Sequence, residues 1–280
     1  MESIIEIIKK RYSVRYYTEK AIEKDKRHKI EEYLSSNIKG PLGSVLRFEL
    51  IDASDYNHNE LKEFGTYGMI TGAKVFIAGA VKKGKYAMED FGYCMEKNVL
   101  AATDFGLGTC WLGGSFNRST FAKKLKVSES ELIPAVSPLG YTGDKKTIKE
   151  SVLRMVIGSK NRKKFDELFL KGNYETPLNS SECEEYSKAL EAVRIAPSAS
   201  NKQPWRIIKE EDKSIFHFYL KENTIYNNAI KGIKIQNIDI GIAMCHFELA
   251  AQELGLKGFW ETNKPALSAG NLLYIASWVG

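Results

Sequence analysis

The chain has 280 residues, of which 43% are hydrophobic and 27% are charged, enough for a substantial core in one large domain or two small ones. Its net charge of +6 comes from Lys and Arg dispersed among Asp and Glu, which argues against a nucleic-acid-binding stripe. The longest apolar run, residues 75–81, is too short to span a bilayer, and the first ten residues do not resemble a signal peptide. Four cysteines without C-x-x-C spacing predict reduced thiols in a cytoplasmic protein.

The first 170 residues alternate helical and strand patterns around one long central helix. Isoleucines at positions 4, 5, 7 and 8 have helix-compatible spacing and lead into the extended segment RYSVRYY, residues 11–17. Helices are predicted at residues 25–36, 86–105 and 119–125, and strands at 45–51, 74–81, 109–113 and 133–141. The last strand is expected to end in the turn Pro138-Leu139-Gly140, and a basic turn to enter a short helix at residues 161–169.

Arg11, Ser13 and Arg15 alternate in RYSVR, so in extended conformation their side chains project to the same side. Two guanidinium groups and a hydroxyl in that arrangement suit a phosphate or another anion. A solvated, charged turn is the alternative interpretation.

Residues 196–205, APSASNKQPW, separate a helical pattern at 184–194 from a β-like run at 206–208. Pro197 ends the helix because proline cannot continue it without the loss of a hydrogen bond. Ser198, Ser200 and Asn201 can bond local backbone or present polar atoms outward. The loop is therefore either an ordinary connection or a rigid row of donors for a ligand. Trp205 is expected to pack in the core.

The chain contains an internal repeat. Residues 90–111 and 239–260 align without a gap at an offset of 149, with nine identities in 22 positions that include Asp90/Asp239, Gly92/Gly241 and Trp111/Trp260. Weaker matches pair residues 45–51 with 205–209, and 135–140 with 275–280. We therefore predict two copies of one α+β unit, residues 1–170 and 171–280.

Each copy lacks what the other has kept. The second has no R-x-S-x-R element, and the first has GPLGSVLRF where the second has APSASNKQPWRI. Such complementary losses are expected if a symmetric dimer with two sites were fused and one site maintained. The alternative is two similar halves without a shared site.

These motifs resemble those of the nitroreductase family of FMN flavoproteins. RYSVR is similar to its R-x-S-x-R/K element, APSASNKQPW to its APS-x-x-N-x-QPW element, and RKKFDEL (residues 162–168) to its C-terminal basic segment. The central helix running into LGTCW and the SPLGY segment are similar too. In that family the QPW element follows R-x-S-x-R within one copy, whereas here it lies in the second copy. The chain thus resembles the fused branch, in which a monomer imitates the homodimer.

The resemblance implies an α+β fold with two pseudo-symmetric halves, each with a mainly antiparallel sheet and a long central helix, and one FMN site between the halves. The implied cofactor-binding residues are Arg11, Tyr12, Ser13, Arg15, Pro138, Leu139, Gly140, Arg162, Pro197, Ser198, Ala199, Asn201 and Gln203.

Their implied roles differ. Arg11 and Arg162 would hold the FMN phosphate, with Tyr12 and Ser13 beside it, and Arg15 would lie near the pyrimidine edge of the flavin. The backbone of residues 138–140 would face flavin N5. The loop at residues 197–201 would line the ribityl chain and ring edge. Gln203 would either contact the ribityl chain or brace the loop, and the glycine-rich residues 65–68 would lie against the ring.

The implied activity is that of an FMN-dependent oxidoreductase that passes a hydride from NADH or NADPH to a small electrophile such as a nitroaromatic or quinone. Flavin N5 carries the hydride, so neither a catalytic side chain nor a metal is expected. The four histidines are scattered, and no G-x-S-x-G element indicates a hydrolase. Alternatives are a flavin or nucleotide carrier or sensor with little turnover, or another flavin chemistry such as dehalogenation or flavin fragmentation. A monomer with a small-molecule substrate and no membrane or nucleic-acid partner is expected.

Overall fold

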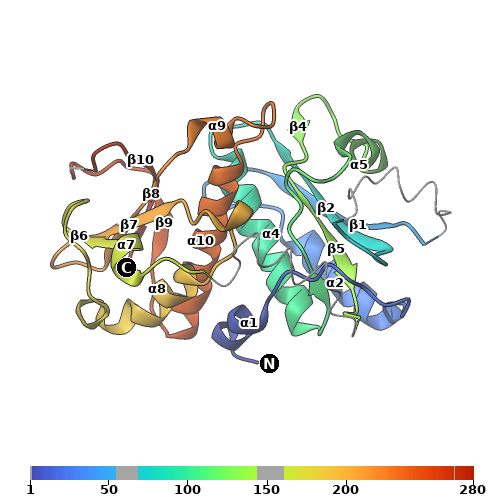
Figure 1. The fold of residues 1–280 in the computed structure, drawn as a ribbon, viewed down its shortest axis with the longest axis horizontal. Helices are drawn as coiled ribbons and strands as arrows, with labels where there is room; N and C mark the ends of the chain where they lie inside the picture. Colours follow the sequence, from blue (N-terminus) through green and yellow to red (C-terminus); the bar gives the residue numbers. More distant parts are fainter. Residues whose placement is uncertain (1, 55–68, 144–160, 268) are drawn as a thin grey trace. The chain divides into compact units, whose positions relative to one another are not determined.

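The structure is a computed structural model, and it describes residues 2–54, 69–143, 161–267 and 269–280 (Figure 1). Its contacts divide the chain into two compact units. Unit 1 comprises Met1–Lys9, Met88–Tyr93 and Val156–Gly280, and unit 2 comprises Lys10–Ala87 and Cys94–Met155. Each unit has its own five-stranded sheet.

The sheet of unit 2 has the strand order β1-β2-β5-β3, and every neighbouring pair is antiparallel. Its strands are β1 (Leu46–Asp52), β2 (Val75–Lys82), β3 (Gly108–Thr109) and β5 (Val136–Gly140), with the short β4 (Glu131–Leu132) paired to β2. The helices are α2 (Lys24–Ser36), most of α4 (Ala87–Asp104) and α5 (Arg118–Lys124). β2 is buried over seven of its eight residues, as its uninterrupted apolar run predicts.

The core of unit 2 joins this sheet to its helices. Phe121 of α5 makes edge-to-face contacts with Phe76 of β2 and with Phe116. α2 contacts β1 and buries Ile30 and Leu34, which are one helical turn apart. The helices are thus held to the sheet by apolar side chains at helical spacing.

The sheet of unit 1 has the order β6-β7-β8-β10-β9, in which only β6 is parallel to its neighbour. Its strands are β6 (Phe169–Lys171), β7 (Trp205–Lys209), β8 (Ile215–Leu220), β9 (Phe259–Glu261) and β10 (Leu273–Val279). The helices and turns are α1 (Ile4–Lys10), α7 (Phe165–Leu168), η1 (Ser180–Glu182), η2 (Glu184–Tyr186), α8 (Ser187–Arg194), η3 (Ala199–Asn201), α9 (Thr224–Asn227) and α10 (Ile235–Glu253). α10 is the longest and most of its residues are buried, as in the core helix of a larger domain.

The two sheets share one topology. In chain order, β1, β2, α4, β3 and β5 correspond to β7, β8, α10, β9 and β10, and the sheet orders β1-β2-β5-β3 and β7-β8-β10-β9 match strand for strand. All three matches seen in the sequence fall on corresponding elements of this series. The predicted fold class, two similar α+β halves with mainly antiparallel sheets and long central helices, is confirmed.

Other local predictions were wrong. Pro138, Leu139 and Gly140 do not form a turn, because they are buried residues of β5 that pair with β2, and the last two also pair with β3. The ladder between β5 and β3 is irregular beside this proline, since the N–H group of Cys110 bonds Ser137 Oγ at 3.0 Å instead of main chain. The strand predicted at residues 109–113 is only Gly108–Thr109, and β6 and β8 had not been predicted.

The compact units do not coincide with the predicted halves 1–170 and 171–280. Residues 161–170 lie in unit 1. There β6 pairs in parallel with β7, and Phe169 lies opposite Ile207 (Figure 1). The predicted boundary at residue 170 separates the two copies of the repeat, whereas the compact units are defined by contacts in space. The boundary between the copies therefore stays a prediction.

The first two turns of α4 and the first two turns of α10 approach each other closely within unit 1. A methyl group added at Gly92 would overlap the carbonyl oxygen of Ile238, and one added at Gly241 would overlap that of Glu89. Glycine at both positions therefore permits the close contact of the two helix backbones.

Candidate functional site

The RYSVR segment of unit 2 lies along β3. Ser13 forms a parallel bridge with Thr109, and the N–H group of Val14 donates to the carbonyl oxygen of Thr109 at 2.8 Å. Thr109 in turn pairs with Leu139 of β5. The structure therefore brings two predicted cofactor-binding elements, residues 11–15 and 138–140, next to the same strand, β3.

Two guanidinium groups of this segment carry buried N–H donors. Arg11 Nη1 and Arg15 Nε have no hydrogen-bond partner among the residues that the structure describes. The Arg11 side chain is only 7% exposed, and its Nε lies 3.9 Å from Oε1 of the buried Glu96. A buried donor without an acceptor is costly, so the site suits a ligand that supplies anionic oxygen atoms. Tyr12, by contrast, is 50% exposed.

In unit 1 the structure brings Arg162 to the APSASNKQPW loop. Arg162 Nη1 donates to Asn201 Oδ1 at 2.5 Å, and Asn201 Nδ2 donates to the carbonyl oxygen of Asn161 at 2.8 Å. The predicted basic segment and the predicted loop are thus one connected structure, although they lie about 40 residues apart in the sequence.

Gln203 uses both ends of its amide to hold this structure together. Its Oε1 accepts from the N–H group of Lys163 at 2.8 Å, and its Nε2 donates to the carbonyl oxygens of Asn161 and Asn201 at 3.2 and 3.0 Å. Only 2% of Gln203 is exposed. Of the two roles that the sequence left open, these contacts fit a brace. Trp205, which follows it, is fully buried, as predicted.

The loop backbone is unusual for residues other than glycine. Ser200, Asn201 and Gln203 have φ angles of 48°, 53° and 48°, in the left-handed region. Such conformations persist only where the surroundings fix them, and they concentrate at functional sites.

Two residues missed in the sequence hold the loop from elsewhere in unit 1. Asp239 Oδ1 accepts from the N–H group of Ala199 at 2.9 Å, and Tyr226 shares a hydrogen bond of 3.0 Å with Ser200 Oγ. Asp239 could have been noticed as one of the identities in the repeat. Nothing in the sequence distinguishes Tyr226.

Cationic groups gather beside the loop. Burial lowers the pKa of Lys163, and the neighbouring Arg206 guanidinium lowers it further. Burial also lowers the pKa of Arg206. With Arg162 these side chains give residues 161–164 a positive environment that suits an anion such as a phosphate.

A cavity of about 260 Å³ lies in unit 2. It reaches Leu139 and Gly140 but none of Arg11, Tyr12, Ser13 and Arg15, and its lining carries the ion pairs Lys74–Glu19 and Arg27–Asp52. It thus adjoins only one of the predicted elements. The predicted ring-contacting residues 65–68 lie outside the described residues.

Other features of the chain are plain. The four cysteines are buried, and none of them forms a disulfide bond with another. Within the described ranges there is no cluster of His, Cys, Asp and Glu that could hold a metal ion. No helix among those residues is long and apolar enough to cross a membrane.

Comparison with known proteins identifies relatives. None of the curated proteins matches this chain in sequence. A solved structure from Thermotoga maritima, described as a "putative nitroreductase", shares the fold with a TM-score of 0.63 at 19% identity, over 99% of this chain and 94% of that one. A nitroreductase family protein of Clostridium novyi is 26% identical over 54% of this chain and 91% of its own, with a TM-score of 0.42.

A family model described as "Putative TM nitroreductase" matches residues 3–251. That range covers most of the 280 residues and includes RYSVR, the basic segment and the APSASNKQPW loop. The chain therefore belongs to this nitroreductase family.

Proposed function

We propose that this protein is an FMN-dependent oxidoreductase that takes a hydride from NADH or NADPH and passes it to a small electrophile such as a nitroaromatic or a quinone. Membership of the nitroreductase family supports the class of reaction. The observation that supports FMN as the cofactor is a pair of buried guanidinium donors. Arg11 Nη1 and Arg15 Nε have no acceptor among the described residues. FMN has phosphate and ring oxygens that would satisfy such donors.

We assign the phosphate to Arg11 and Arg162, because a guanidinium group can offer two parallel N–H donors to phosphate oxygens. Tyr12 and Ser13 would lie beside it. On this proposal a single FMN site takes residues from both halves of the chain, as the complementary losses of motifs in the two halves suggest.

When bound, FMN would supply the atom that accepts and returns a hydride. The chain's own residues would hold and tune it. Arg15 would offset negative charge at the pyrimidine edge of the ring, which favours the reduced form. The backbone of residues 138–140 would border the reacting edge. The loop at Pro197, Ser198, Ala199 and Asn201 would contact the ribityl chain and ring, with Gln203 bracing it.

The direct test is purification followed by an absorption spectrum. The expected protein is yellow, carries about one FMN per chain, and loses its flavin absorption on addition of NADH or NADPH without oxygen. A colourless protein that also fails to bind added FMN would contradict the proposal. FMN binding without reduction by either nucleotide would overturn the assigned activity and support a carrier or sensor.

Two variants test the shared site. Arg11→Ala and Asn201→Ala should each weaken FMN binding at least tenfold, measured by quenching of flavin fluorescence, because each removes a proposed contact or its support. Arg47→Ala and Asn263→Ala are matched controls that remove the same side chains from contacts with carboxylates to which no role in FMN binding is assigned. If only one of the two site variants weakens binding, the two segments do not serve the same FMN.

A further inference from the structure

The cofactor loop, residues 198–203, is held in a conformation that its sequence does not favour. Three of its residues other than glycine have left-handed backbone angles, with φ near 50°. Because this conformation is unfavourable for residues with a β-carbon, contacts outside the loop must maintain it. The contacts therefore identify which residues determine the shape of the loop.

Two of these contacts are at least partly exposed to solvent. Asn201 is bound by Arg162, and Ser200 by Tyr226, and both links are at least partly exposed to solvent. Ser198 Oγ accepts from the N–H group of Gln203 within the loop. The link between the N–H group of Ala199 and Asp239 is different, because it fastens the loop to the long helix α10.

Asp239 lies in a setting that disfavours an ionised carboxylate. Asp239 is only 3% exposed, and its Oδ2 atom is buried without a hydrogen-bond partner in the described parts of the chain. Burial raises the pKa of Asp239 well above its usual value. The hydrogen bond from the Ala199 N–H group lowers this pKa, but by less than burial raises it. A neutral carboxylic acid still offers its carbonyl oxygen to the Ala199 N–H group.

We propose that Asp239 on α10 is the positioning residue that fixes the cofactor loop through Ala199, and that it thereby sets the affinity for FMN although it makes no contact with the cofactor. This inference rests on the proposed function. It assigns Asp239 no contact with cofactor or substrate. Asp239 acts by fixing the position of Ala199, and this keeps the next two residues, Ser200 and Asn201, in their left-handed conformation.

The repeat supplies a matched control. Asp90 aligns with Asp239 at the offset of 149, and it is also fully buried. The half that contains Asp90 has GPLGSVLRF in place of the cofactor loop. Asp90→Ala therefore removes an equivalent buried acid without removing the anchor of residues 198–203.

The test compares Asp239→Ala, Asp239→Asn and Asp90→Ala. Asparagine has nearly the same shape, retains an acceptor for the Ala199 N–H group and cannot ionise. Asp239→Ala should weaken FMN binding at least tenfold in a fluorescence titration, whereas Asp239→Asn should stay within about threefold of the unaltered protein. Asp90→Ala should leave FMN affinity within the same threefold range, whatever it costs in stability.

A second measurement does not need FMN. Hydrogen exchange at the Ala199 amide in the protein without cofactor should accelerate at least tenfold in Asp239→Ala and remain slow in Asp239→Asn. Full FMN affinity in Asp239→Ala, or a tenfold loss in Asp239→Asn, would overturn the inference. If the alanine variant fails to fold, the asparagine variant decides alone. If no variant and not even the unaltered protein binds FMN, the proposed function fails while the exchange result still tests the positioning of the loop.

Discussion

At the scale of single residues, Gly92 and Gly241 show why some repeat positions tolerate no side chain. The two glycines are equivalent in the repeat, and so are the residues that they meet, because Ile238 and Glu89 are also 149 positions apart. Each glycine therefore makes in one direction the contact that its counterpart makes in the other. The obstacle in each case is main chain, which cannot rotate away as a flexible side chain can.

Gly241→Ala should lower the free energy of unfolding by about 3 kcal/mol, at the upper end of overpacking effects, because the new methyl group would meet the backbone of Glu89 and lie 2.8 Å from the Tyr93 nitrogen. Urea denaturation measures this loss. Gly84→Ala is the control, since only one atom lies as near as 4.0 Å to its added methyl group. A loss below about 1 kcal/mol in Gly241→Ala would show that the helices can separate at little cost.

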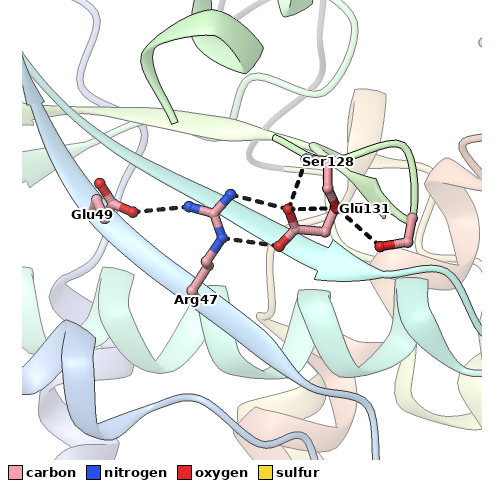
Figure 2. A network of polar contacts seen from close by, with 5 residues as sticks. Arg47, Glu49, Ser128 and Glu131 are labelled. Carbon is pink, nitrogen blue, oxygen red and sulfur yellow. Dashed lines mark hydrogen bonds and ion pairs between the residues drawn. The ribbon is translucent and has the colours of Figure 1, made fainter. Parts of the chain in front are cut away.

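Glu131 gives unit 2 a pH-dependent link between β1 and β4. Its carboxylate accepts two hydrogen bonds from Arg47, at 2.9 and 3.1 Å, and further bonds from Ser128 (Figure 2). The hydrogen bonds from Arg47, above all, lower the pKa of Glu131 to about 2 from an ordinary value of 4.5. The unfolded chain therefore binds this proton more readily than the folded one, and the stabilisation is complete above pH 4.5 and lost as the pH falls toward 2.

Glu131→Gln should consequently lower the free energy of unfolding by about 1 kcal/mol at pH 7, since the pair is bidentate but partly exposed. The difference from the unaltered protein should shrink steadily between pH 4.5 and pH 2.5. Urea denaturation at several pH values measures both. Glu49→Gln, which removes a single bond to the same arginine, should cost about 0.3 kcal/mol. A deficit in Glu131→Gln that stays constant with pH would contradict this account.

At the scale of elements, Gln203 joins the segment at residues 161–163 to the APSASNKQPW loop. Gln203→Leu would leave the N–H group of Lys163 and two carbonyl oxygens without these bonds, so the free energy of unfolding should fall by about 2 kcal/mol. Hydrogen exchange at the Lys163 amide should accelerate. Gln252→Leu removes an exposed hydrogen bond from its amide to Glu248 one turn away, and it should have little effect. Unchanged exchange at Lys163 would show that other contacts hold the segment.

The elements also show what the sequence could predict. The long helices and β2 were predictable because apolar periodicity or an uninterrupted apolar run extends over many residues. β6 is three residues long and exists through its pairing with β7, which no local pattern reveals. Pro138 suggested a turn on propensity, but tertiary pairing of β5 with β2 and β3 prevailed.

The candidate site was predictable as a set of segments but not as a set of contacts. RYSVR, the basic segment and the QPW loop stand out through residue types that suit an anion. The bonds from Arg162 to Asn201 and from Ala199 to Asp239 span about 40 residues, and they depend on how α10 and the loop pack. The left-handed backbone of Ser200 could not be predicted, because serine rarely adopts it, whereas asparagine, as at position 201, adopts it more often.

At the scale of the whole molecule, the repeat carried most of the prediction. Nine identities in a central helix and the residues that follow it predicted two copies, and the matching sheet orders bear out the common topology. The division of the chain into compact units could not be predicted in the same way. Residues 161–170 end the predicted first copy, yet they lie in unit 1, and β6 joins the sheet of the second copy.

The reciprocal glycine contact leads to a prediction about assembly. In a dimer with a two-fold axis, an isologous contact joins residue i of one chain to residue j of the other, and j to i. Gly92 with Ile238 and Gly241 with Glu89 have this relation within one chain, because the partners are equivalent pairs of the repeat. The surface that two identical chains would share is thus already used inside unit 1.

We therefore expect a monomer. Sedimentation equilibrium should give a mass of 31.6 kDa that does not change with protein concentration, with or without added FMN. In the variant Gly241→Ala the measured mass should rise with protein concentration, because a loosened helix contact would expose apolar surface and favour association between chains. An obligate dimer of the unaltered protein would show that the duplication did not replace the interface between subunits, and one FMN per chain would then no longer follow from the fusion.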